Sequence, residues 1–225
     1  MRYSNTDTYE MKRDILRFCE KICDGAGAAE TRLAKDMIYG ILASGQCTLS
    51  RVADVLQEPI KKCNVIDRLS RNLAEGVSER LQANYARQMR RMLPEEGTVF
   101  VDDGDAIKPY GKKFENLGIV RDESSPQKRH EKGYHVTEIT AVTARTRHPV
   151  SLYSHIHSST EKDYVSANEE TYTALRTVLQ ILPKATYVFD RGFDMNALFK
   201  FLNANKCTST SKPSCFFTTA SAYTG

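Results

Sequence analysis

The sequence has no apolar run approaching the roughly 18 residues that a membrane-spanning helix needs. Its first residues, MRYSNTDTYEMKRD, are too polar for a secretory signal peptide. Its six cysteines lack the paired CxxC spacing of a zinc knuckle, so reduced thiols are the simpler interpretation. These absences favour a soluble, cytoplasmic protein that contacts no membrane.

The charge balance is mildly basic, with 32 Lys and Arg against 28 Asp and Glu and a formal net charge of +4. A positive bias favours polyanionic partners such as nucleic acid, although it does not identify one. With 225 residues, the chain can hold one medium-sized domain and a smaller one.

Two aspartate motifs are the most informative features of the chain. Each is a short apolar run that ends on an acidic residue: TVFVDDGD at residues 98–105 and TYVFDRGFD at residues 186–194. A buried strand delivers such a carboxylate to the rim of a sheet, and two neighbouring rims can hold a divalent metal. In the first motif, Asp103 and Asp105 fall on one side of the strand and Asp102 on the other, because side chains alternate. Asp102 and Asp105 remain alternatives to Asp103 as the metal ligand of this motif.

The residues between the two motifs predict a mixed α+β fold. Residues 134–143 and 149–155 are rich in β-branched and aromatic side chains without a helical period, which is typical of two strands joined by a turn. Ser166 and Glu169 form a capping-box signature, and an apolar helical period follows until Pro183. The order strand, strand, strand, helix, strand makes the first and fourth strands plausible neighbours.

Residues 1–97 are predicted to be helical throughout, with apolar faces at helical spacing. Residues 48–73 have the pattern of a helix-turn-helix interrupted near Pro59. On its exposed side we expect Arg68 and Arg71 to meet DNA phosphates. A basic helix over residues 79–93 is expected to connect this region to the first strand.

The strings VDDGDAIKPYGK and YVFDRGFD, with the KGY segment between them, resemble the catalytic core of DDE transposases of bacterial insertion sequences. The likeness covers roughly residues 2–205. It implies an RNase H-like core that cleaves and transfers DNA strands with Mg²⁺ or Mn²⁺ at the ends of a mobile element. It also implies Asp103 and Asp190 as the catalytic and metal-binding residues, double-stranded DNA as the partner, and nucleoid association without a small-molecule cofactor.

Basic residues beside the two motifs are the expected DNA contacts of the core. Lys108, Lys112 and Lys113 lie in the loop that follows the first motif, where they can track the DNA backbone. Arg191 directly follows Asp190, where a guanidinium can contact a phosphate or a displaced base.

The chain departs from the family pattern after the second motif. The family needs a third acid, a glutamate on a later helix, but no glutamate follows Glu170. Residues 206–225 are rich in Ser and Thr and show neither a strand nor a helix period, which predicts an aberrant, disordered tail. We therefore expect three parts: a helical region (1–97), an incomplete β-β-β-α-β-α core (98–205) and this tail. The whole is expected to be a truncated or frameshifted, inactive form.

Two other interpretations remain open. The string VFVDDGD also resembles the nucleophile motif of haloacid-dehalogenase-type phosphatases, but that fold requires helices between successive parallel strands. Alternatively, the chain is not an enzyme, and its helical region binds DNA or forms a homodimer as an inhibitor of an intact relative.

Overall fold

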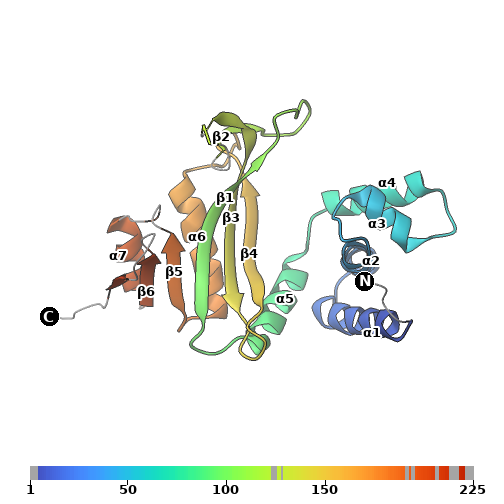
Figure 1. Ribbon diagram of the computed structural model, residues 1–225, viewed down its shortest axis with the longest axis horizontal. Helices are drawn as coiled ribbons and strands as arrows, with labels where there is room; N and C mark the ends of the chain where they lie inside the picture. The colour runs from blue at the N-terminus through green and yellow to red at the C-terminus, as the bar shows by residue number, and fades with distance from the viewer. Residues whose placement is uncertain are drawn as a thin grey trace. The chain divides into compact units, whose positions relative to one another are not determined.

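The computed structural model describes residues 5–122, 126–127, 129–190, 193, 196–205, 208–212 and 218–220 (Figure 1). The chain divides into two compact units, Met1–Gln88 and Met89–Gly225. The division falls inside a helix, earlier than the predicted boundary at residue 97. Strands and helices occur together, which confirms the mixed α+β class. Within the described residues, no helix has the length and apolar character needed to cross a membrane.

The first unit is helical, as predicted. Its core gathers small and branched apolar side chains from three successive helices: Leu33, Val52, Ala53, Val65 and Leu69. The helices are α1 (Asn5–Ile22), α2 (Ala28–Ser44), α3 (Leu49–Leu56), α4 (Lys62–Ala74) and α5 (Glu79–Met92), the last of which runs past the unit boundary.

Helices α2 and α3 cross at a glycine, and this contact gives a stability prediction. A Cβ atom at Gly40 would lie 2.4 Å from Cγ1 of Val52. Helix propensity alone would make Gly40→Ala stabilising by about 1 kcal/mol, whereas overpacking of a core costs about 1–3 kcal/mol. We expect Gly40→Ala to lower the free energy of unfolding in urea. Adding Val52→Ala should restore part of the loss; a stabilised Gly40→Ala variant would contradict the close crossing.

The second unit is a sheet with helices. Its elements are β1 (Thr98–Ile107), β2 (Gly118–Arg121), β3 (His130–Val142), β4 (Pro149–His157), α6 (Ala167–Ile181), β5 (Thr186–Asp190), α7 (Asn196–Ala204), β6 (Thr208–Lys212) and β7 (Thr218–Ala220). The strands follow the order β2-β3-β1-β5-β6-β7, and β4 also pairs with β3 (Figure 1). Strand β3 is antiparallel to β1 and β4, whereas β5 is parallel to β1.

Several local predictions for this unit are confirmed. Strands β3 and β4 cover the two predicted strands, with a turn between them. The backbone N–H of Glu169 donates to the side chain of Ser166 at 3.2 Å, so Ser166 caps α6 as expected. The first and fourth predicted strands, β1 and β5, are neighbours, with Thr98 opposite Thr186 and Val101 opposite Phe189.

Three strands, β2, β6 and β7, were not predicted. Strand β2 is short and pairs with the start of β3. Strand β6 pairs in parallel with β5, so the expectation that no strand follows β5 is wrong. The sequence TSTSK has no apolar alternation, and its strand exists because the edge of β5 offers unpaired backbone groups to it. Residues 206–207, 213–217 and 221–225 of the predicted tail lie outside the described part.

Candidate functional site

The two faces of the sheet differ in burial, and this difference decides which acids lie together. Val99 and Val101 of β1 and Tyr187 and Phe189 of β5 are at most 2% exposed. Phe100, between the two valines, is 42% exposed. Side chains alternate along a strand, so one face is covered and the other is open.

Asp102 and Asp190 lie at neighbouring positions of the open face. Val101 and Phe189 are paired, and both belong to the covered face. Asp102 directly follows Val101, and Asp190 directly follows Phe189, so both aspartates belong to the open face. Across the other edge of β1, Glu138 of β3 is directly opposite Asp102. Three adjacent strands therefore carry a carboxylate in one row.

The predicted pairing of Asp103 with Asp190 stays a prediction, and this register favours Asp102 as the neighbour of Asp190. Asp103 follows Val101 by two residues and shares its covered face, with Thr137 opposite it on β3. The alternation that separates Asp103 from Asp102 also separates it from Asp190. The apolar pattern of each strand already favours this arrangement. Asp103 is two residues from Val101 and shares its face, whereas Asp190 is adjacent to Phe189 and lies on the other face.

Asp103 belongs instead to a polar cluster on the covered face. The register aligns it with Thr137 on β3 and His155 on β4. Next to this row, Oδ1 of Asp105 lies 2.9 Å from Nδ1 of His135, within hydrogen-bond distance. Glu170 of α6 reaches His155 with an Oε2 to Nδ1 distance of 3.4 Å, so α6 packs on this face.

His157 lies at the centre of the cluster and is only 2% exposed. Its Nε2 is 3.1 Å from the hydroxyl of Thr137, and its Nδ1 has no hydrogen-bond partner among the described residues. Burial lowers the pKa of His157 below its ordinary value, because desolvation disfavours the imidazolium. The ring is therefore neutral at physiological pH and is a packing element of the covered face.

The pKa of Asp103 is shifted in the opposite direction. Partial burial of the Asp103 carboxyl group raises its pKa above the ordinary value, because desolvation disfavours the charged form. A hydrogen bond with Thr137 opposes the rise, whereas the neighbouring charge of Asp102 adds to it. The raised pKa of Asp103 is therefore explained mainly by desolvation of its carboxyl group.

The acids of the open face have suitable chemistry for a hard cation. Asp102, Glu138 and Asp190 offer only carboxylate oxygens, which Mg²⁺ and Mn²⁺ prefer. Like charges directly opposite each other on a sheet are destabilising, so Asp102 and Glu138 are placed where a cation would relieve repulsion. Among the described residues, no group of three or more His, Cys, Asp or Glu is arranged so that it could hold a metal ion. Mg²⁺ commonly uses one or two protein carboxylates together with substrate phosphates.

The predicted DNA contacts of the core are partly described. Lys108, Lys112 and Lys113 are all exposed in the connection between β1 and β2. Their ammonium groups are therefore accessible to a phosphate backbone. Arg191 lies outside the described residues.

In the helical unit, Arg68 and Arg71 have different surroundings. Arg71 is exposed, as expected. The side chain of Arg68 is only 17% exposed and pairs with Asp36 at 2.7 Å and with Glu58. Arg32 also contacts Glu58, at 2.9 Å. The expectation that Arg68 lies on the exposed side is therefore wrong, because two carboxylates on neighbouring segments hold it inside the unit.

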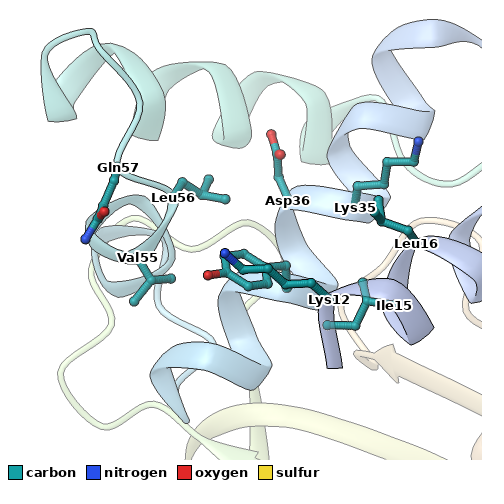
Figure 2. A pocket seen from close by; sticks show the side chains of 9 residues that line it. Lys12, Ile15, Leu16, Lys35, Asp36, Val55, Leu56 and Gln57 are labelled. Carbon is teal, nitrogen blue, oxygen red and sulfur yellow. The ribbon is translucent and has the colours of Figure 1, made fainter. Parts of the chain in front are cut away.

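A cavity of about 400 Å³ lies in the same unit, lined by residues of α1, α2 and the end of α3 (Figure 2). Its walls include the aliphatic side chains of Ile15, Leu16 and Leu56 and the side chain of Lys12. The Lys12 ammonium lies 5.1 Å from the centre of the Tyr39 ring, a cation–π contact. The lining therefore combines apolar side chains with the charged groups of Lys12, Lys35 and Asp36.

Comparisons with protein-family models and with curated protein sequences found no match to this chain.

Proposed function

We propose that the Met89–Gly225 unit is an RNase H-like core that processes DNA by metal-dependent phosphoryl transfer, as transposases of insertion sequences do. The observation that supports the proposal is the parallel pairing of β1 and β5, which ends at Val101 and Phe189, directly before Asp102 and Asp190. An antiparallel β1-β3-β4 meander on one side of β1, with β5 and β6 on the other, also fits such a core. The antiparallel strands argue against a phosphatase built on a fully parallel sheet.

The residues of this chain have distinct roles in the proposed reaction. Asp102 and Asp190 would hold Mg²⁺ or Mn²⁺, with Glu138 beside them. When bound, the metal supplies charge that activates the attacking oxygen and stabilises the leaving one. Lys108, Lys112 and Lys113 position double-stranded DNA through its phosphates, which carry no sequence information themselves. In the helical unit Arg71 contributes the same kind of contact.

A second candidate is DNA binding without cleavage, in which the chain could act as a homodimer. The observation that favours it is that no three or more His, Cys, Asp or Glu of the described residues form a group that could hold a metal ion. Phosphate contacts by lysine and arginine do not depend on such a group, so DNA affinity would survive where cleavage does not.

One experiment separates these functions. The purified 225-residue chain is incubated with supercoiled plasmid and Mn²⁺, and both DNA retention and nicking are measured. Nicking that disappears in Asp102→Asn supports the phosphoryl-transfer function. Retention without nicking supports the second candidate. A chain that neither retains nor nicks DNA contradicts both.

A further inference from the structure

The connection between β1 and β2 exposes aromatic side chains to an unusual extent. Tyr110 is 92% exposed and Phe114 is 57% exposed, and both lie in the segment 108–117. Single exposed apolar side chains are common on protein surfaces. Two rings within five residues form a small hydrophobic surface that water solvates poorly. Such a surface is a candidate contact for a flat apolar partner.

The backbone of this segment is held at several points. The N–H of Lys108 donates to the carbonyl of Lys132 at 2.7 Å, and the N–H of Gly111 donates to the carbonyl of Lys108 at 2.9 Å. At the far end, the Thr160 hydroxyl donates to the carbonyl of Asn116 at 2.8 Å. The rings are therefore presented by an ordered turn, which reduces the entropy lost when a partner binds.

Gly111 allows one of the rings to pack against the turn. A Cβ atom at this position would lie 2.7 Å from Cδ2 of Phe114 and 3.1 Å from the carbonyl oxygen of Lys108. Because glycine has no Cβ atom, the Phe114 ring can pack against the backbone of Gly111. Phe114 nevertheless remains more than half exposed. The turn therefore supports Phe114 from one side and leaves the remainder available.

The same segment is basic. Lys108, Lys112 and Lys113 are exposed and surround Tyr110, with Glu115 as the one acidic residue of residues 108–117. Lysines contact phosphates of single-stranded and duplex DNA alike. An aromatic ring, however, can stack only on a base whose face is free. Alternation of cationic and aromatic side chains is how proteins bind unpaired strands.

We propose that Tyr110 and Phe114 stack on unpaired DNA bases while the adjacent lysines hold the phosphates. The inference rests on the proposed DNA-processing function and specifies the form of its substrate. Strand β1 runs from Asp102 towards Lys108, which directly follows the strand. Six residues of strand span about 20 Å. The same length corresponds to roughly six base-pair steps of duplex DNA. The stacked bases therefore belong to an opened or single-stranded segment a few nucleotides from the carboxylate row.

The test measures the affinity of the full chain for a fluorescent oligonucleotide, single-stranded and as the matching duplex. We expect Tyr110→Ala to weaken single-strand binding about 10-fold and to leave duplex binding unchanged. Tyr110→Phe keeps the ring and should bind like the original protein. Tyr9→Ala removes another exposed tyrosine, which is 68% exposed in the helical unit, and is the matched control. Circular dichroism checks that each variant is folded.

Salt dependence provides a second measurement. Tyr110 is uncharged, so its removal should leave the slope of log affinity against log salt unchanged. Replacing Lys112 and Lys113 by glutamine should reduce the single-strand slope by about 1.4, since each contact contributes about 0.7. An unchanged affinity in Tyr110→Ala, or an equal loss on both DNA forms, would overturn the stacking inference and leave the proposed function standing. An original chain that binds neither form contradicts the proposed function itself.

Discussion

Asp102→Asn should weaken Mn²⁺ binding about 100-fold, as measured by the electron paramagnetic resonance signal of free Mn²⁺ during titration. Loss of a partner that only orients a metal ligand reduces affinity by about 10- to 100-fold, and loss of a ligand should have at least the upper effect. Asparagine keeps the size of the side chain and removes the charge that attracts the cation. Asp190→Asn should give a similar loss, because the two carboxylates share the open face.

Asp103→Asn is the matched control for this prediction. It makes the same chemical change one residue away but on the covered face, opposite Thr137. We expect its Mn²⁺ affinity to equal that of the original chain. If Asp103→Asn loses the metal and Asp102→Asn keeps it, the argument from the strand register is wrong and the pairing predicted from the sequence is correct.

Arg68→Ala should lower the free energy of unfolding of the helical unit by about 2–4 kcal/mol, measured by urea denaturation. Removal of one partner from a largely buried ion pair costs about 3–5 kcal/mol when the remaining charge has no other partner. The effect is expected to be somewhat smaller here, since Arg32 still contacts both Glu58 and Asp36. Replacing Arg68, Asp36 and Glu58 together by leucine should recover much of the loss, because no unpaired charge then remains.

Arg71→Ala should change DNA binding and leave stability nearly unchanged. The side chain is on the surface, so the free energy of unfolding should change by no more than about 0.5 kcal/mol. Loss of one phosphate contact should reduce the salt-dependence slope for duplex DNA by about 0.9. A stable Arg71→Ala variant with an unchanged slope would assign α4 a packing role only. A large loss of stability would show that Arg71 has an internal partner as Arg68 does.

Local patterns in the sequence were sufficient for most of the secondary structure. Apolar spacing of 3.6 residues predicted the helices of the first unit, and β-branched alternation predicted β3 and β4. The capping box at Ser166 located the start of α6. These features depend on neighbours within a few residues, so they can be predicted directly from the local sequence. The adjacency of β1 and β5 also followed from the order of the elements.

The tertiary structure decided what depends on distant partners. A one-residue difference in phase moves a strand side chain to the other face of a sheet. The pairing of β1 with β5 therefore favours Asp102, rather than Asp103, as the neighbour of Asp190. Arg68 looked like a surface residue because Asp36 and Glu58, which hold it, lie 32 and 10 residues away. Strand β6 likewise exists through the edge of β5. The sequence by itself determined which segments are helices and strands and which side chains could bind metal or DNA. Their final neighbours depended on long-range packing, which local periodicity does not encode.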